Sequence, residues 1–246
     1  MKHPEVDKRV RFYQEQADSG SLISADYNQK VLDELYGAFS PSTVHRICDV
    51  GCGMGRNLPL LRRRFPQATI VALDLNPMAA RAASGAASHV LVAQGNCAAI
   101  PLPGEAADLA VCTEVLEHVS NLTEAVAEIA RVTRSGGFCV ISSPNYLNPI
   151  GLRKWNEDRR RGSEFWDPWG GHEGYERLMT PRLVDSTVRK HFKILRVRGA
   201  GYIMAWIPLG YSRIGARHDR YPMIGLGRFP VLRNLAMNRY LLLRKW

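Results

Sequence analysis

The middle of the chain alternates short apolar runs with segments whose apolar residues recur at helical spacing. The apolar runs predict strands at 46–50, 69–74, 89–94, 108–113 and 137–142. The segments with helical spacing lie between them, at 57–65, 77–84 and 122–134. Near-continuous apolar strands that alternate with helices are typical of a parallel sheet covered on both faces. The pattern therefore predicts an α/β fold, a Rossmann-like doubly wound sheet over residues 46–143.

The flanking regions show weaker patterns. Residues 1–45 are polar with helical spacing, and Gly37 is a typical helix stop. After the core, Thr180 followed by proline predicts the start of a helix over 181–191. Two further strands are expected at 192–198 and 239–244. The connection between these strands, 199–238, is long, and connections of this length usually carry a function or lack a fixed structure.

Three glycines at alternate positions follow the first strand, in the sequence Asp49-Val50-Gly51-Cys52-Gly53-Met54-Gly55. Glycine adopts positive φ and lets a ligand approach the backbone, and the following helix presents unpaired N–H groups to that ligand. The dinucleotide fingerprint G-x-G-x-x-G would need a glycine at position 56, which is Arg56. The turn therefore predicts a nucleotide-type pocket and disfavours an NAD-dependent dehydrogenase.

Asp74 ends the second predicted strand, 19 residues after Gly55. A carboxylate at this place can accept hydrogen bonds from both hydroxyls of a ribose. A turn or helix-capping role fits the sequence Asp-Leu-Asn-Pro as well. With the glycine turn upstream, ribose binding is the preferred interpretation.

Four segments in register resemble motifs of the class I S-adenosylmethionine (SAM)-dependent methyltransferases, in their small-molecule branch. The first is the glycine turn. The second, 95–103, is similar to G-D-A-x-x-L-P-F with Asn96 in place of the acid. The third, 114–119, reads E-V-L-E-H-V, and the fourth, 131–137, is similar to R-x-L-x-P-G-G with Ser135 in place of proline.

The resemblance implies SAM as the cofactor and S-adenosylhomocysteine as its product. The residues that it places at the cofactor are Asp49, Gly51, Cys52, Gly53, Gly55, Asp74, Leu75, Asn96, Cys97 and Glu114. It also implies an antiparallel last strand and three regions of one domain. These are an N-terminal helical cap (1–45), the SAM-binding core (46–143), and a region (144–246) with a substrate lid, the last two strands and a basic insertion.

Methyl transfer from a sulfonium requires an acceptor held in line and, for a hydroxyl acceptor, a base. The candidates for catalysis are His172, His118 and Tyr175. The resemblance places His172 and Tyr175 in the lid, in a segment that begins Gly-His. For His118, a hydrogen-bonded structural role is the alternative.

Glu114, Glu117 and His118 would share one face of a helix, if this segment is helical. Such a face can bind a divalent cation, with His172 as a further ligand, as similar segments do in related O-methyltransferases. The same residues can instead close the floor of the pocket, so the predicted site includes no metal ligands.

The net charge of +10 is unevenly distributed. Residues 151–246 hold 20 Lys and Arg against 8 Asp and Glu, whereas residues 1–150 hold 13 against 15. This asymmetry predicts an anionic or amphiphilic small-molecule substrate, with a peripheral membrane contact or a homodimer contact through 199–238 as further interpretations. An RNA partner is disfavoured, because no recognised RNA-binding motif is present.

The five cysteines form no C-x-x-C pair, and no signal peptide or membrane span is predicted, so we expect a cytoplasmic protein. We expect an enzyme, a SAM-dependent methyltransferase that acts on a small-molecule or lipid-linked acceptor, with a hydroxyl oxygen as the preferred acceptor atom. An RNA or protein methyltransferase, or a non-catalytic SAM-binding regulatory module, is the alternative.

Overall fold

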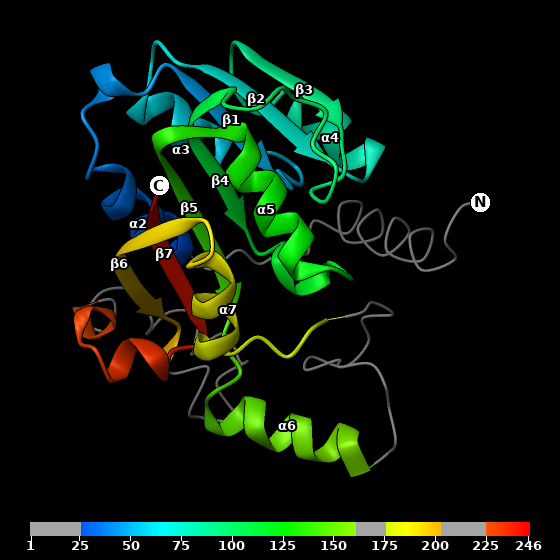
Figure 1. Ribbon diagram of the computed structural model, residues 1–246, viewed down its shortest axis with the longest axis vertical. Helices are drawn as coiled ribbons and strands as arrows, with labels where there is room; N and C mark the ends of the chain where they lie inside the picture. The colour runs from blue at the N-terminus through cyan, green and yellow to red at the C-terminus, as the bar shows by residue number, and fades with distance from the viewer. Residues whose placement is uncertain (1–25, 161–175, 203–224) are drawn as a thin grey trace.

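The computed structural model describes residues 26–160, 176–202 and 225–246. These residues form a seven-stranded sheet in the order β3-β2-β1-β4-β5-β7-β6 (Figure 1). The first five strands pair in parallel, and β7 lies antiparallel between β5 and β6. The predicted doubly wound, mostly parallel sheet with an antiparallel last strand is confirmed.

The element bounds are as follows. The strands are β1 (Arg46–Val50), β2 (Thr69–Asp74), β3 (Val90–Gln94), β4 (Ala107–Thr113), β5 (Thr133–Pro144), β6 (Phe192–Ala200) and β7 (Asn238–Lys245). The α-helices are α2 (Asp26–Tyr36), α3 (Leu58–Arg64), α4 (Pro77–Ala83), α5 (Leu122–Val132), α6 (Pro149–Arg160) and α7 (Pro181–Val188). The 3₁₀ turns are η1 (Pro41–Thr43), η2 (Leu116–His118), η3 (Gly225–Arg228) and η4 (Leu232–Asn234).

Two hydrophobic cores cover the two faces of the sheet. Because side chains alternate along a strand, Ile47 of β1 joins the core beneath α2, α3 and α4, whereas its neighbour Cys48 joins the core beneath α5 and α7. Each fully buried leucine, such as Leu58 or Leu109, stabilises the fold by about 1.5–3 kcal/mol. The sheet is thus a rigid base for whatever lies at its strand ends.

Helix α2 is fixed to the body at several points. Its apolar face packs into the core beneath α3, and the helix ends at Tyr36, where Gly37 N–H donates to Asp33 O. The Asp33 carboxylate accepts two hydrogen bonds of 2.6 Å from Arg64 of α3. Glu34 pairs with Arg198 of β6. The predicted helix stop at position 37 is confirmed.

Several predicted boundaries differ from the observed ones. The helix expected over 122–134 ends at Val132, and the next strand, expected to begin at 137, begins at Thr133. Thr133 adopts an extended conformation and pairs with Ala107 of β4. The strand therefore begins where the helix was expected to continue. The helix expected over 181–191 ends at Val188; its start is confirmed, because Thr180 Oγ1 accepts a hydrogen bond from Leu183 N–H.

Part of the long connection before β7 packs closely on β6. A Cβ on Gly227 of η3 would lie 1.9 Å from the carbonyl oxygen of Gly199, so the two backbones touch. After η4, Asn145 Nδ2 donates to the carbonyls of Asn234 and Ala236. These contacts fix where β7 begins, at Asn238.

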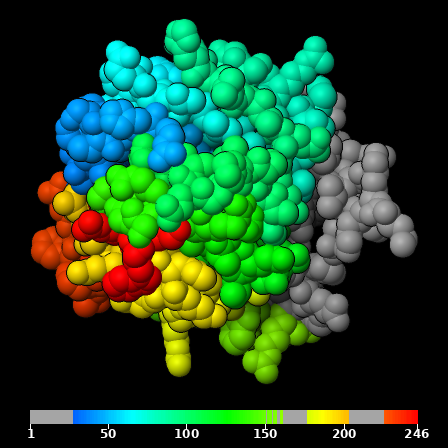
Figure 2. Space-filling view, turned by 45° about the horizontal axis from the view of Figure 1, so that its top comes forward, coloured from blue at the N-terminus to red at the C-terminus, as the bar shows by residue number. Residues whose placement is uncertain are grey.

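Helix α6 projects from the body at the lower side of Figures 1 and 2. Its Trp155 is 40% exposed, and Arg159 lies over the indole ring. Among the described helices, none has the length and apolar character needed to cross a bilayer. All five cysteines are free thiols, four of them buried.

Candidate active site

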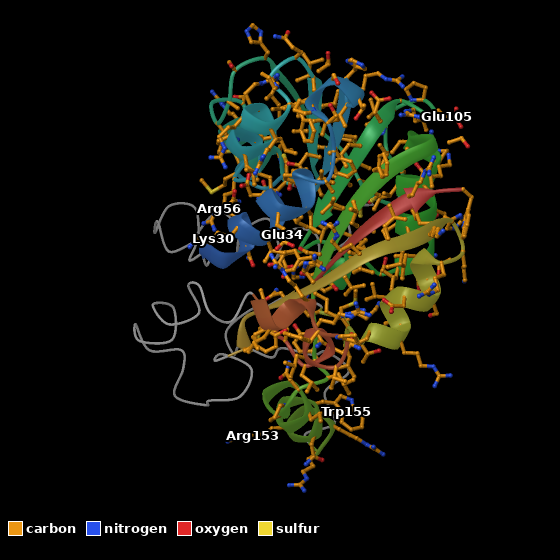
Figure 3. The ribbon with its side chains drawn as sticks, turned by 90° about the vertical axis from the view of Figure 1, so that its left-hand side faces the viewer. Lys30, Glu34, Arg56, Glu105, Arg153 and Trp155 are labelled. Carbon is orange, nitrogen blue, oxygen red and sulfur yellow. The ribbon has the colours of Figure 1, made fainter. Side chains whose placement is uncertain are left out.

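The site lies at the carboxyl ends of the central strands. From β1, the chain proceeds outward through β2 and β3 to one edge of the sheet, whereas β4 and β5 extend to the other side. Ligands of open parallel sheets bind at such a switch point, outside the carboxyl ends of the strands. Figure 3 marks this end of the sheet by Arg56 and the opposite end by Glu105.

The glycine turn (residues 51–55) follows β1, and its glycines provide positive φ angles and space that side chains would fill. All three have positive φ, +74° at Gly51, +52° at Gly53 and +80° at Gly55. A Cβ on Gly51 would lie 2.3 Å from Val115 Cγ2, and one on Gly55 would lie 2.7 Å from the Ala86 Cβ. A Cβ on Gly53 would meet nothing within 4 Å. Packing therefore excludes side chains at the first and third glycines, and the second faces open space.

The N–H groups of Gly51 and Cys52 donate to the carbonyl of Leu73 at 2.7 and 2.9 Å. This pair of bonds fixes the turn to the end of β2. The Cys52 thiol is buried, and burial raises its pKa. Cys52 therefore contributes its backbone and its bulk to the turn, and its thiol stays protonated.

Asp49 lies beneath the turn with 0% of its surface exposed, and neither carboxylate oxygen has a hydrogen-bond partner. Burial, and then repulsion from Asp74, raise its pKa to about 7. The buried Tyr36 hydroxyl of α2 likewise has no hydrogen-bond partner and interacts electrostatically with Asp49. An unpartnered buried carboxyl group costs stability, so its presence here favours a role in binding.

Asp74 ends β2 and holds the turn from the other side. Its Oδ2 accepts from Gly53 N–H and its Oδ1 from Asn76 N–H, both at 2.8 Å. Burial raises the pKa of this carboxyl, and these two N–H groups partly offset the effect. The turn role considered for Asp74 is thus real, and Asn76, which accepts from Met78 N–H, is the cap of α4. Each Asp74 oxygen keeps acceptor capacity, so ribose binding stays a prediction.

Three predicted cofactor residues lie further along this strand edge. Leu75 is 41% exposed directly after Asp74. Asn96 is exposed, and its Oδ1 accepts from Ala98 N–H at 2.9 Å. Cys97 is half-buried beside it. Their roles at the cofactor stay predictions.

Glu114 follows β4 with a positive φ of +55°, so it does not lie on a helix. The expected helical face shared with Glu117 and His118 is wrong, since only the 3₁₀ turn η2 forms there. Ser142 of β5 donates to Glu114 Oε1 at 2.6 Å, and Asn238 of β7 donates to Oε2 at 2.7 Å. Burial raises the pKa of Glu114 to about 7.

Glu117 interacts electrostatically with Glu114 and Glu176, and we call these three residues the acid cluster. Glu117 is 2% exposed, its Oε2 has no hydrogen-bond partner, and its Oε1 lies 3.8 Å from His118 Nε2. Burial, and then repulsion from Glu114 and Glu176, raise its pKa well above the usual range. Glu176 accepts from the Tyr146 hydroxyl at 2.6 Å.

Two of the three catalytic candidates, His172 and Tyr175, lie outside the described residues. Within those residues, no three His, Cys, Asp or Glu side chains are arranged to hold a metal ion. The metal alternative, which included His172, stays a prediction.

Sequence reasoning missed Ser142 and Asn238, which hold Glu114, and Asn57, which links the glycine turn to β4. The signal for Asn57 was present, since it directly follows the turn. Asn238 offered none, because only the pairing of β7 with β5 brings it to the site.

Residues 48–141 match the family described as Methyltransferase domain. The chain is 30% identical over 135 residues to a probable S-adenosylmethionine-dependent methyltransferase of Mycobacterium tuberculosis, covering 50% of this chain and 48% of that protein. It is 33% identical over 128 residues to the malonyl-[acyl-carrier protein] O-methyltransferase of Serratia marcescens, covering 51% and 47%. The chain thus spans about half the length of the curated relatives it matches.

Among solved structures, an S-adenosylmethionine-dependent methyltransferase from Mesorhizobium loti aligns with a TM-score of 0.57. The alignment covers 86% of this chain and 96% of that chain at 16% identity. At this identity the likeness establishes the fold alone.

The described residues fit SAM, the cofactor of this family. The open space at Gly53 leaves room for a ligand against the backbone, and the unpartnered Asp49 carboxyl can receive a cationic group. Asp74 stands at the strand end where a ribose binds in such sheets. By its domain match over residues 48–141, its sequence likeness to S-adenosylmethionine-dependent methyltransferases and its fold, the chain is similar to the class I family of these enzymes.

Proposed function

We propose that this protein transfers the methyl group of SAM to a hydroxyl oxygen of a small-molecule or lipid-linked acceptor. The observation that carries the proposal is the acid cluster beside the glycine turn. Val115, the neighbour of Glu114, fills the space that a side chain at Gly51 would occupy. A relative of the chain is named an O-methyltransferase, which supports oxygen as the acceptor atom.

The cofactor supplies a methyl group on a positively charged sulfur, which leaves as a neutral thioether. The chain must hold the acceptor oxygen at about 3–3.5 Å from that methyl group and in line with it. A hydroxyl must also lose its proton as its oxygen attacks, so a nearby base accelerates the reaction.

Glu114 is our candidate for this base, with His118 as the second. The Glu114 carboxyl is half-buried, and Ser142 and Asn238 fix both of its oxygens. A base is most effective when its pKa lies near the working pH, and the pKa of Glu114 is raised to about 7. The proton of the hydroxyl would pass to a Glu114 oxygen, and burial, with repulsion from Glu176, would keep the pKa of the carboxyl in this range.

On the cofactor side, we propose Asp74 for the ribose hydroxyls and Asp49 for the cationic amino group of SAM. The cofactor would lie against the backbone at Gly53, where a side chain would meet nothing within 4 Å. On the acceptor side, the basic residues after position 150 favour an anionic or amphiphilic acceptor.

The test uses SAM with a tritiated methyl group, added with the purified full chain to an extract of the source organism. The label is sorted into organic-soluble, small aqueous, nucleic-acid and protein fractions, with and without EDTA. We expect alkali-stable label in the organic or small aqueous fraction, as a methyl ether has. Alkali-released methanol would indicate a carboxylate acceptor, and label in nucleic acid or protein would contradict the proposal.

Glu114→Gln is the variant that tests the base. We expect SAM affinity to stay unchanged and turnover to fall by about a hundredfold or more. Glu105→Gln, which removes a carboxylate at the opposite end of the sheet (Figure 3), is the matched control. A loss of SAM affinity in Glu114→Gln would assign Glu114 to the cofactor, and an unchanged turnover would remove it from proton transfer.

A further inference from the structure

We propose that Gln29 of α2 is a positioning residue of the cofactor site, which acts through Asn57 on the end of β4. Gln29 Nε2 donates to Asn57 Oδ1 at 3.2 Å. Asn57 Nδ2 in turn donates to Thr113 Oγ1 at 2.8 Å. This Gln29–Asn57–Thr113 bridge joins three elements that lie far apart in the sequence.

The bridge connects the end of the glycine turn to the end of β4. Asn57 follows the turn directly, and Thr113 precedes Glu114. In Figure 3, Lys30 and Arg56, the chain neighbours of Gln29 and Asn57, lie close together where α2 meets the turn. The bridge therefore fixes the distance between the loop proposed for the cofactor and the residue proposed for proton transfer.

The Asn57 side chain makes this bridge and does not cap helix α3. It occupies the N-cap position of α3, where an asparagine side chain typically accepts a hydrogen bond from the first turn of the helix. Here its side chain makes no capping bond, and the residue adopts a helical conformation. With 9% of its surface exposed, Asn57 uses its amide on Gln29 and Thr113 instead. Because Asn57 bonds to Gln29 and Thr113 where a helix cap would be usual, we infer that the bridge has a function.

Helix α2 is suited to act as a fixed reference for the bridge. Its Glu34 pairs with Arg198 of β6 and Arg228 of η3. Asn28, next to Gln29, accepts a hydrogen bond from the Tyr240 hydroxyl of β7. The helix is thus anchored to β6 and β7, and Gln29 connects it to Asn57, directly after the glycine turn.

The inference rests on SAM as the cofactor but not on methyl transfer, so its test measures binding alone. The dissociation constant of SAM is measured by calorimetry for the full chain and for Gln29→Leu, together with the melting temperature. Loss of one hydrogen bond that orients the site should raise the dissociation constant about fivefold, with a small change in melting temperature. An unchanged dissociation constant would overturn the proposal.

Glu34→Gln is the matched control on the same helix. It weakens the ion pairs that anchor α2 and leaves the bridge intact, so we expect a lower melting temperature with SAM affinity near that of the wild type. If Glu34→Gln weakens SAM binding as much as Gln29→Leu does, general docking of α2 explains both effects, and the positioning role is wrong.

A double-mutant cycle that combines Gln29→Leu with Thr113→Val shows whether the two hydrogen bonds of Asn57 act together or independently. Gln29 and Thr113 share Asn57 as their partner, so the second substitution should cost little once the first is made. We expect each single variant to weaken SAM binding about fivefold and the double variant by less than about tenfold. Effects that multiply fully would show that Gln29 and Thr113 act separately and would overturn the bridge.

Discussion

At the scale of residues, the molecule contains two kinds of carboxyl group. Asp108, at the end of the sheet opposite the site, accepts hydrogen bonds from Arg46 and Arg134, and its pKa is lowered. Asp49 and Glu114 have no such cationic partner among their hydrogen bonds, and their pKa is raised to about 7. The acid that stabilises the fold is paired with arginines, whereas those at the site have no cationic partner among their hydrogen bonds.

Asp74→Ala tests the cofactor side of the site. The substitution removes an acceptor for the ribose and also frees Gly53 N–H, so we expect SAM affinity to fall about tenfold to a hundredfold. Asn76→Ala, in the same turn, removes the cap of α4 and should lower stability by about 1 kcal/mol without loss of affinity. Calorimetric titration with SAM measures both variants; equal affinities would remove Asp74 from the ribose role.

The sequence could predict the parts of the site that directly follow a strand along the chain. The glycine turn, Asp74 and Glu114 each follow a strand, so a strand prediction places them at one edge of the sheet. The spacing of Glu114 to His118 suits a helix, but it does not determine whether the segment is helical, and Glu114 has a φ of +55°. Ser142 and Asn238 could not be predicted, since their meeting depends on the pairing of strands about a hundred residues apart.

At the scale of elements, the backbone of η3 packs directly against that of β6. Gly227 and Gly199 allow it, because neither has a side chain. The turn pattern of this connection was not predicted from the sequence. Its apolar and arginine content suited several roles, whereas the observed packing depends on glycines whose partners are distant in the chain.

Gly227→Ala should separate η3 from β6. The added Cβ would lie 1.9 Å from the Gly199 carbonyl oxygen, so we expect the free energy of unfolding to fall by about 1–3 kcal/mol. Gly225→Ala is the control in the same turn, where a Cβ meets nothing within 4 Å and stability should change little. Denaturant unfolding compares the two; equal stabilities would mean that the contact between η3 and β6 is loose in solution.

At the scale of the whole molecule, the raised pKa values make stability depend on pH. Asp49 and Glu114 titrate at about 7 in the folded protein, against 3.8 and 4.5 as ordinary values. Between these values the folded state binds more protons than the unfolded state, so stability falls as the pH rises from about 4 to 7. Asp33, Asp108 and Glu128 have lowered pKa values and act in the opposite sense, losing stability as the pH falls below about 4.

We therefore expect the ligand-free protein to melt at its highest temperature near pH 5 and at lower temperatures toward pH 8. Glu114→Gln should flatten this decline, because the amide does not ionise. Asp108→Asn should instead lower the melting temperature throughout pH 5 to 8, because the lowered pKa keeps this carboxylate ionised over that range. Scanning calorimetry from pH 4 to 8 measures these profiles, and a wild-type melting temperature that is constant from pH 5 to 8 would contradict the assignment.

The place of β7 in the sheet has a consequence for how the newly made chain folds. During synthesis β7 leaves the ribosome after every other described element, yet it lies between β5 and β6, where Phe138 pairs with Arg244. Until then β6 has no strand to join, and Glu114 lacks the amide of Asn238. Pairing across such a long stretch of chain is slow. A nascent chain can thus assemble the glycine turn early, but the Glu114 carboxyl gains its hydrogen bond from Asn238 only when the sheet closes.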